Sequence, residues 1–230
     1  MTQLFRIHPE NPQLRLIRQA IDVLDEGGVI AFPTDSSYAL GCRIGDKQAS
    51  DRIRAIRKLS EDHNFTLICP DLSELSTYAK INKETFKLLK EYTPGPYTFI
   101  LPATKEVPRR LQHPKRKTIG IRIPDHPVVK AFLEELHNSL MSVTLFLPGE
   151  EKPLDKAEEI YQKLNRQVDV ILDSGFCDNE PTTVVDFTSN EDGTARILRI
   201  GKGNPNPFAA PDQKDNTTKS SFSQIFEKLK

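Results

Sequence analysis

Apolar and polar residues follow two periods in turn along this chain, that of an amphipathic helix and that of a buried strand. Residues 14–24 carry an apolar face of helical period, and Gly27 and Gly28 end the pattern. A short apolar run at residues 29–32 follows and stops at Pro33, which has no N–H to continue a strand ladder. Helix and strand patterns keep following one another for most of the length, which is typical of an α/β protein.

The same periodicity predicts the remaining elements. Helices are expected at residues 14–24, 46–59, 72–79, 84–92, 126–137 and 157–164. Strands are expected at residues 29–32, 65–69, 97–101, 118–123, 140–147, 168–172, 183–187 and 195–200. This order predicts a twisted, mixed open sheet flanked by helices.

The composition changes near the C-terminus. Residues 201–221 are rich in Asn, Pro, Lys, Asp, Ser and Thr, which predicts a linker or a flexible tail. We therefore expect one domain at residues 1–207 and a tail at residues 208–230. Four apolar residues of the tail have helical spacing and predict a short amphipathic helix that docks on the domain or on another chain: Phe222, Ile225, Phe226 and Leu229.

Cysteine content and the N-terminal sequence indicate the cellular compartment, whereas net charge does not identify a ligand class. The chain has 230 residues with 32 Lys plus Arg and 32 Asp plus Glu, so net charge points to no ligand class. Cys42, Cys69 and Cys177 have no paired spacing and are typical of reduced thiols. The N-terminus is too polar for a signal peptide, and no apolar run is long enough to cross a bilayer. We expect a cytoplasmic protein that does not contact a membrane.

Small polar residues follow the strand at residues 29–32. They are Thr34, Asp35, Ser36 and Ser37, and Tyr38 then adds an aromatic ring with a polar tip. Polar groups at the end of a buried strand are where α/β proteins usually contact ligands. An ordinary polar turn would explain the same residues, and this segment alone leaves both interpretations open.

Two arginines occupy otherwise apolar strands. Arg122 alternates with Ile121 and Ile123, so its side chain is expected on the opposite face of the strand. Arg199 repeats the pattern at residues 197–201. An arginine in such a position needs either a structural carboxylate or a bound anion. Two such positions favour an anion site, although structural ion pairs would explain both.

Other basic residues cluster on the expected surface. In the helix at residues 46–59 the spacing of Arg54, Arg57 and Lys58 predicts a shared face, which suits either a nucleoside triphosphate or solvent. Residues 105–117 form a basic loop that could follow a phosphate backbone or simply face water.

Several common catalytic motifs are absent from the sequence. It contains no phosphate-binding glycine loop and no nucleophile elbow. The five histidines show no metal-ligand spacing, and His63, in a polar loop, is expected at the surface. An enzyme with these residues would act by positioning and charge stabilisation, without a protein nucleophile.

Several ordered motifs within residues 14–203 resemble those of a known family. They read GGVIAFPTDSSYALGC, HNFTLIC, TPGPYTFILPA, IGIRIPDHP, PTTVVDF and ILRIGKG. Together they resemble the YrdC/YciO family of threonylcarbamoyl-AMP synthases, and most closely its YciO branch.

The resemblance implies an α/β fold around a large basic cavity and a nucleotidyltransferase-type activity. The implied reaction joins L-threonine, bicarbonate and ATP into threonylcarbamoyl-AMP and releases pyrophosphate, for the N6-threonylcarbamoyladenosine modification of tRNA. Mg²⁺ would accompany ATP, and no protein-bound metal is expected.

The resemblance also implies roles for individual residues. Those expected to bind threonine or its carbamate are Thr34, Tyr38 and Arg122. Those expected to face the nucleotide are Arg57, Lys58, Ser142, Thr182 and Arg199. Those expected to take part in catalysis are Arg57, Lys58, Ser142 and Thr144.

Two positions depart from the family pattern. The family's Lys-x-Arg is Arg57 and Leu59 here, and its Ser-x-Asn is Ser142 and Thr144. Leu59 offers no charge, although Lys58 could substitute. Because losing one transition-state donor commonly costs about 10²–10³ in rate, two functions remain open. One is a weak synthase, and the other is a paralogue that binds nucleotide, tRNA or double-stranded RNA without this reaction.

Overall fold

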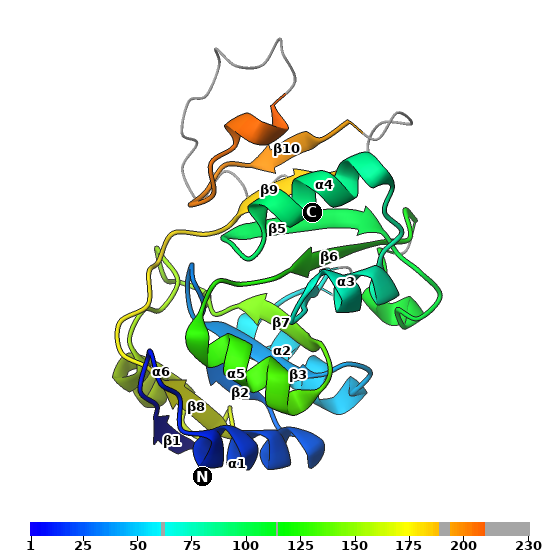
Figure 1. Cartoon of the computed structure of the whole chain (residues 1–230). Helices are drawn as coiled ribbons and strands as arrows, with labels where there is room; N and C mark the ends of the chain where they lie inside the picture. Colours follow the sequence, from blue (N-terminus) through cyan, green and yellow to red (C-terminus); the bar gives the residue numbers. More distant parts are fainter. Residues whose placement is uncertain (61–62, 114, 189–193, 210–230) are drawn as a thin grey trace.

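The computed structural model describes residues 1–60, 63–113, 115–188 and 194–209. Its centre is a 10-stranded mixed sheet with the order β1-β8-β2-β3-β7-β4-β6-β5-β9-β10, which confirms the predicted fold class. Figure 1 shows the sheet rising from β1, near the N-terminus, to β10. The strands are β1 (Gln3–Arg6), β2 (Ile30–Phe32), β3 (Ala39–Arg43), β4 (Thr66–Ile68), β5 (Tyr97–Pro102), β6 (Thr118–Arg122), β7 (Leu140–Thr144), β8 (Val170–Asp173), β9 (Thr183–Asp186) and β10 (Arg196–Arg199).

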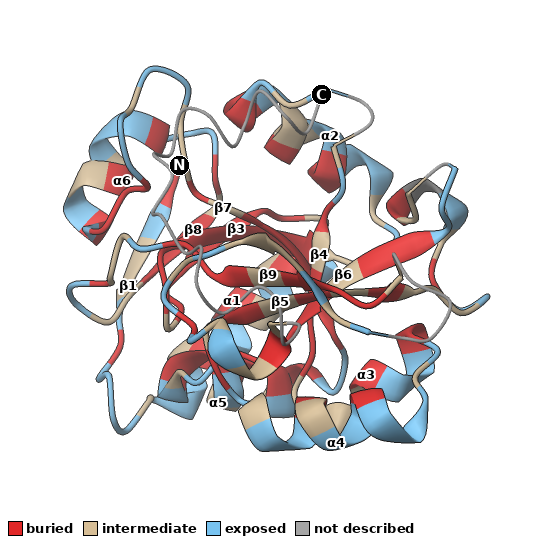
Figure 2. Cartoon of the chain, turned by 90° about the horizontal axis from the view of Figure 1, so that it is seen from above, coloured by how far each residue is buried: buried red, intermediate tan, exposed pale blue. Residues whose placement is uncertain are grey.

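Helices lie on both sides of the sheet. They are α1 (Leu14–Asp25), α2 (Lys47–Arg57), α3 (Leu72–Tyr78), α4 (Lys83–Tyr92), α5 (Pro127–Leu136) and α6 (Ala157–Leu164), with short 3₁₀ helices η1 (Arg109–Leu111) and η2 (Asn206–Phe208). In Figure 2, α2 and α6 lie on one side, and α1, α3, α4 and α5 lie on the other. The strands between them are mostly buried. No described helix is both long enough and apolar enough to span a bilayer.

The ends of α2 follow from its flanking residues. The Asp46 side chain accepts a hydrogen bond from the Ala49 N–H and so caps the start of the helix. At the other end Lys58 has φ 51°, in the left-handed region, and leaves the helical path. Arg54 and Arg57 lie three residues apart within α2 as predicted, but the predicted place of Lys58 on their face is wrong, because the backbone leaves the helix at Lys58.

Two strands were not predicted. β1 pairs in parallel with β8 at the edge of the sheet, and none of its side chains is fully buried. β3 pairs antiparallel with both β2 and β7, directly after the polar segment at residues 34–37. β1 carries neither an apolar run nor an alternation, whereas the apolar residues of β3 follow so closely on the polar segment that its start is obscured.

Residues 201–209 are part of the packed domain, so the predicted linker begins too early. Phe208 is 3% exposed, and its ring centroid lies 5.1 Å from that of Tyr92 and 5.4 Å from that of Tyr97. Phe99 and Phe187 complete this aromatic cluster. Phe208, one residue past the predicted boundary at residue 207, thus packs on the domain as an aromatic anchor within the polar stretch. The predicted amphipathic helix at residues 222–229 lies outside the described residues.

We expect the Phe208→Ala variant to lose about 3–5 kcal/mol of unfolding free energy, because it empties the centre of the aromatic cluster. Urea denaturation of the purified protein measures this loss. The matched control is Phe86→Ala on α4, where the ring is 40% exposed, and its cost should stay below about 1 kcal/mol. Equal losses for the two variants would contradict the packing of residues 201–209 on the sheet.

Candidate functional site

One face of the sheet between β7 and β10 carries hydroxyl groups, a glycine and an arginine. Thr66 of β4 pairs with Ser142 of β7 on one side and with Gly120 of β6 on the other. In β5, Ile100 pairs with Gly120, so Thr98, two residues away, shares this face. We term this set the polar row, and in strand order it comprises Ser142, Thr66, Gly120, Thr98, Thr182 and Arg199.

Hydrogen bonds connect neighbours in the polar row. The Ser142 hydroxyl donates to the Thr66 carbonyl oxygen at 3.2 Å. The hydroxyls of Thr98 and Thr182 lie 2.8 Å apart. Arg199 donates from Nε to the Thr182 carbonyl and from Nη2 to its hydroxyl, both at 3.0 Å. The last three residues of the row are therefore held as a unit.

Gly120 leaves a gap in the middle of the polar row. A Cβ at this position would lie 3.3 Å from Thr66 Oγ1 and 3.6 Å from Thr98 Cγ2. Any side chain here would therefore fill the space between the two threonines. The glycine lets a ligand approach the backbone of β6 between two hydroxyl groups.

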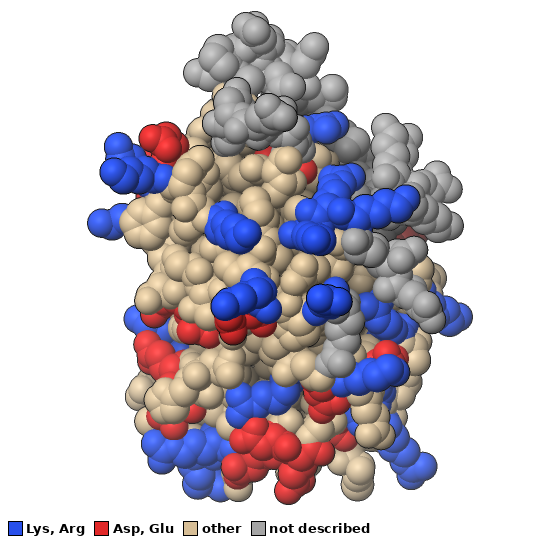
Figure 3. All heavy atoms as spheres, turned by 90° about the vertical axis from the view of Figure 1, so that its right-hand side faces the viewer, with Lys and Arg blue, Asp and Glu red and all other residues tan. Residues whose placement is uncertain are grey.

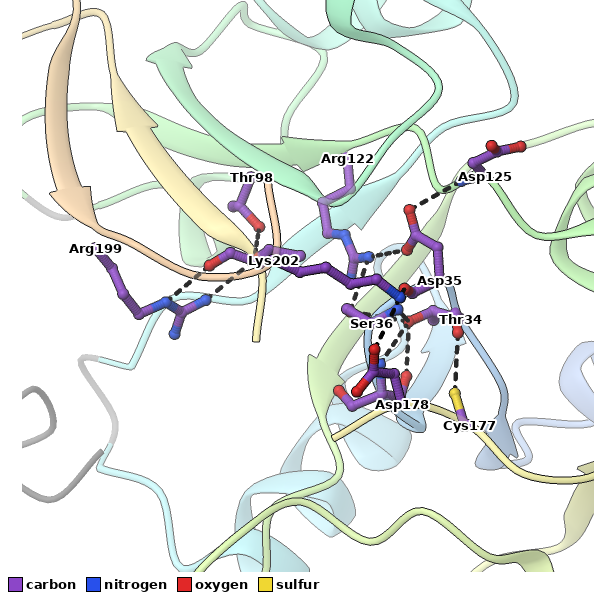
Figure 4. A network of polar contacts seen from close by, with 12 residues as sticks. Thr34, Asp35, Ser36, Thr98, Arg122, Asp125, Cys177, Asp178, Arg199 and Lys202 are labelled. Carbon is purple, nitrogen blue, oxygen red and sulfur yellow. Dashed lines mark hydrogen bonds and ion pairs between the residues drawn. The ribbon is translucent and has the colours of Figure 1, made fainter. Parts of the chain in front are cut away.

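Arg122 lies two residues beyond Gly120 on the same face of β6. Its Nη2 lies 2.6 Å from Asp35 Oδ1 and 3.1 Å from Ser36 Oγ, and both side chains of the ion pair are 8% exposed (Figure 4). Asp35 Oδ2 in turn accepts the Asp125 N–H at 3.0 Å. The sequence left open whether Arg122 pairs with a structural carboxylate or with a bound anion. Asp35 supplies the structural carboxylate. The buried Nε of Arg122 has no hydrogen-bond partner among the described residues, so one edge of the guanidinium remains able to donate to an anion.

Thr34 shapes the loop that carries Asp35 and Ser36. Its Oγ1 accepts the N–H groups of Ser36 and Ser37, each at 3.2 Å, and donates to the Ser37 carbonyl at 2.6 Å. The side chain is buried, so the hydroxyl that was predicted to bind threonine is engaged within the loop.

Tyr38 does not line this face. It is completely buried in the core, and its hydroxyl donates to the Gly175 carbonyl at 3.1 Å. Burial raises the pKa of this phenol, so it stays protonated. The expectation that Tyr38 lines a ligand site is corrected, because strand alternation turns it toward the core while Ala39 takes the other face.

Arg57 is buried and Arg199 is partly buried, and neither has a carboxylate at salt-bridge distance in the described chain. Arg57, at the end of α2, lies over the Phe146 ring at 5.6 Å, and its Nε has no partner there. Burial lowers the pKa of Arg57 to about 10. Burial, together with the neighbouring Arg122 charge, lowers the pKa of Arg199 to about 10. A desolvated cation without an acid gains more from a bound anion than a solvated one does.

His63 was expected at the surface, and the structure corrects this. Arg54 lies over Phe65 and donates to the carbonyls of Ser60 and His63 at 2.8 and 3.2 Å, which holds these two residues near α2. His63 is partly buried and feels the charges of Arg57 and Arg54. Burial, with the Arg57 and Arg54 charges, lowers the pKa of His63 to about 4. His63 is therefore neutral at pH 7.

Of the two remaining residues that were predicted for the site, one lies on the face of the polar row and the other does not. Thr144 lies on the face of Ser142 and is partly exposed, whereas Lys58 is exposed beyond the end of α2. Cavities of about 490 and 380 Å³ lie elsewhere, one beside Phe176 and one beside Arg52. Within the described residues, no three His, Cys, Asp or Glu side chains converge as metal ligands would.

Sequence reasoning did not single out Thr66, Thr98 or Gly120. The signal for Thr98 lies in β5, where the buried rings of Tyr97 and Phe99 on either side turn the threonine to the opposite face. The pairing that brings the three together depends on strand order, which local patterns do not contain.

Residues 22–201 match the family model Sua5_yciO_yrdC, whose description is "Telomere recombination". The chain belongs to this family. It is 53% identical over 208 residues to the uncharacterized protein YciO of Escherichia coli K12, covering 90% of this chain and 100% of YciO. The crystal structure of E. coli YciO superposes with a TM-score of 0.86 at 52% identity, covering 91% of this chain and 100% of the other.

Relatives with a named activity are more distant. Threonylcarbamoyl-AMP synthase of Chromobacterium violaceum is 31% identical over 192 residues, covering 83% of this chain and 96% of the synthase. The structure of P. abyssi Sua5 complexed with L-threonine has a TM-score of 0.79 at 26% identity, covering 87% of this chain and 58% of Sua5. The Sua5/YciO/YrdC family thus contains threonylcarbamoyl-AMP synthases, while YciO is the more similar relative.

We expect His63 to make the fold less stable in mild acid. The unfolded His63 takes up a proton near its ordinary pKa of about 6.5, whereas in the folded protein its pKa is lowered to about 4. Stability is therefore full above about pH 6.5 and falls by on the order of 1–3 kcal/mol as the pH drops toward the folded value.

Urea unfolding of the wild type and of His63→Gln between pH 4.5 and 7.5 measures this contribution. The wild type should lose more stability than the variant over this range. His126, whose pKa burial also lowers, is present in both proteins and cancels in the difference. Parallel stability curves would contradict the buried position of His63.

Proposed function

We propose that this protein binds ATP and L-threonine along the polar row and forms threonylcarbamoyl-AMP from them and bicarbonate. The observation that carries the proposal is that the buried Arg57 and the partly buried Arg199 have no carboxylate at salt-bridge distance in the described chain. Anionic ligands would neutralise them. The synthase relatives and the threonine complex of Sua5 support the choice of substrates.

The proposed reaction brings anions together. The threonine amine adds to the carbon of bicarbonate and, with loss of water, gives a carbamate. A carbamate oxygen then attacks the α-phosphorus of ATP, the bond from this phosphorus to the bridging oxygen breaks, and pyrophosphate leaves. The contribution expected of the protein is therefore positioning and positive charge. Mg²⁺ would bind mainly through the phosphates of ATP and offset their charge.

The geometry suggests a division of roles. The free edge of Arg122 is suited to the carboxylate of threonine or of its carbamate. Arg199 and Thr182, held together by two hydrogen bonds, would contact the nucleotide. Arg57, together with Ser142 and Thr144 at the other end of the polar row, would lie near the reacting phosphate, and Lys58 could assist from the helix end. Thr34 would act through the loop that it shapes.

We expect the wild type, given L-threonine, bicarbonate and Mg-ATP, to release pyrophosphate slowly and only when threonine is present. The double variant Leu59→Arg/Thr144→Asn restores a cation and an amide at the positions that depart from the family pattern. Because each such donor is commonly worth about 10²–10³ in rate, turnover should rise at least about tenfold. A coupled pyrophosphate assay measures both proteins.

The control is Leu59→Met/Thr144→Ser, which adds neither a charge nor an amide and should leave turnover near the wild-type value. A circular-dichroism melt of each variant shows whether the substitutions disturb the fold. No release by the wild type or by the restored variant, with an active synthase working under the same conditions, would refute the proposed reaction.

A basic surface supports a second candidate function, the binding of RNA. Exposed basic side chains lie in the segment between β5 and β6 that contains η1, namely Lys105, Arg109, Lys115, Arg116 and Lys117. Of these, Arg116 approaches an acid, with Nη1 3.9 Å from Asp186 Oδ2. Figure 3 shows basic side chains prevailing over the upper half of one face of the molecule, whereas acidic and basic side chains mix below. We propose that this stretch contacts the phosphates of tRNA or double-stranded RNA.

We expect Lys115→Gln/Arg116→Gln/Lys117→Gln to weaken tRNA binding and to lower the slope of log Kd against log salt by about 2, because each lost phosphate contact removes about 0.7–0.9. Fluorescence anisotropy with labelled tRNA at several salt concentrations measures this. Lys47→Gln/Lys130→Gln/Lys156→Gln removes the same charge from exposed positions elsewhere and serves as the control. An equal effect of both triple variants would contradict a specific surface.

A further inference from the structure

Lys202 connects parts of the site that are distant in the sequence. It follows β10, and its backbone is fixed on the start of β9. The Lys202 N–H donates to the Pro181 carbonyl at 2.9 Å, and the Gly201 N–H donates to Thr183 Oγ1 at 3.0 Å. The same threonine hydroxyl donates to the Gly203 carbonyl at 2.5 Å. The base of the lysine side chain therefore has a defined position.

Glycines on both sides allow this close approach. A Cβ at Gly201 would lie 2.1 Å from the Pro181 carbonyl oxygen, and a Cβ at Gly203 would lie 2.4 Å from Cε1 of Tyr97. No other residue fits at either position without moving the backbone or the ring. The segment is thus built to lie against β9 and to project one long side chain.

The Lys202 ammonium reaches two other loops (Figure 4). Its Nζ donates to the Asp35 carbonyl at 2.6 Å and lies 3.0 Å from Asp178 Oδ2. The Asp35 contact joins residues 167 positions apart. Lys202 therefore links the end of β10 to the loop after β2 and to the loop after β8.

Both contacts of Lys202 support the groups that hold Arg122. Asp35 presents its carboxylate to Arg122 while Lys202 binds its carbonyl. Next to Asp178, Cys177 Sγ donates to the Thr34 carbonyl at 2.9 Å. The loop that carries Thr34 and Asp35 is thus held from both sides, and Lys202 is the residue that connects the two supports.

We propose that Lys202 is a positioning residue, a latch that fixes the loop at residues 34–37 so that Asp35 orients the Arg122 guanidinium toward the ligand. The effect of the latch on ligand binding rests on the proposed function. Its effect on the order of the loop does not depend on that function. The pair with Asp178 is more than one-third exposed on both sides, so its contribution to global stability is small. Its effect is expected in the local order of the loop.

The first experiment uses the full chain without ligand. Cys177 is 4% exposed and contacts Thr34, so opening of the loop makes its thiol accessible. Lys202→Met should raise the alkylation rate of Cys177, read by peptide mass spectrometry, about tenfold, and should speed amide exchange at residues 34–37. Lys202→Arg, which keeps the charge, should stay near the wild type. The matched control is Lys47→Met, which removes a lysine paired with Asp51 on the surface of α2.

A melting curve keeps this experiment interpretable. All variants should melt within about 3 °C of the wild type, because exposed ion pairs contribute little to global stability. Under these conditions, unchanged Cys177 alkylation and unchanged exchange in Lys202→Met would overturn the latch.

The second experiment measures ligand binding. Wherever the wild type releases pyrophosphate, Lys202→Met should raise KM for threonine about tenfold with a smaller change in kcat, because Arg122 is misoriented before chemistry begins. Lys202→Arg should recover most of the loss. An unchanged KM for threonine in Lys202→Met would overturn the positioning role. A wild type without activity would instead refute the proposed function and leave the latch to be decided by loop order alone.

Discussion

Strict alternation of side chains across the strands from β7 to β9 is the constraint on which the site depends. One face buries Met141, Leu67, Ile121, Phe99 and Val185, all of them fully enclosed, and cross-strand pairing places them next to one another. The other face of the same strands carries the polar row. Because the side-chain period of a strand is 2, a register shift of one residue would move the hydroxyls to the apolar face and the apolar residues to the face of the polar row. The hydrophobic core therefore fixes the spacing of the polar groups, and the hydrogen bonds among Thr98, Thr182 and Arg199 add to this order.

The three arginines of the site differ in their electrostatic environment. Arg122 has an internal acid, Asp35, which defines its orientation, but burial outweighs this partner and lowers the pKa of the guanidinium. Arg199 repels Arg122 and, within the described residues, is hydrogen-bonded to the carbonyl and hydroxyl oxygens of Thr182, while Arg57 lies over the Phe146 ring. The three guanidiniums thus differ in how far they are neutralised before any ligand binds. This gradient suits a reaction in which one anion must be oriented and another must be stabilised as its charge changes.

Local patterns predicted most helices and strands because these elements bury one side, which leaves a periodic trace in the sequence. The edge strand β1 leaves no such trace, and β3 follows a polar turn that obscures its start. For the candidate site, alternation correctly placed Arg122 opposite Ile121 and Ile123, but its partner Asp35 lies 87 positions away and is not visible locally. The burial of His63 and of Tyr38 likewise depends on which element packs above each side chain. Long-range pairing, which sets the order of the strands, is the information that one sequence does not reveal.

The position of β1 has a consequence for synthesis of the chain. Gln3 lies beside Val170, and β2 pairs with the same strand β8. On a ribosome that adds about 5–20 residues per second, roughly 8 to 30 seconds separate the appearance of these two partners. During this interval one edge of β2 has no partner, because β8 has not yet been made. The apolar face of α1 also lacks the part of its packing that β8 supplies. During this period the nascent chain exposes unpaired strand edges and apolar surface, which chaperones can bind.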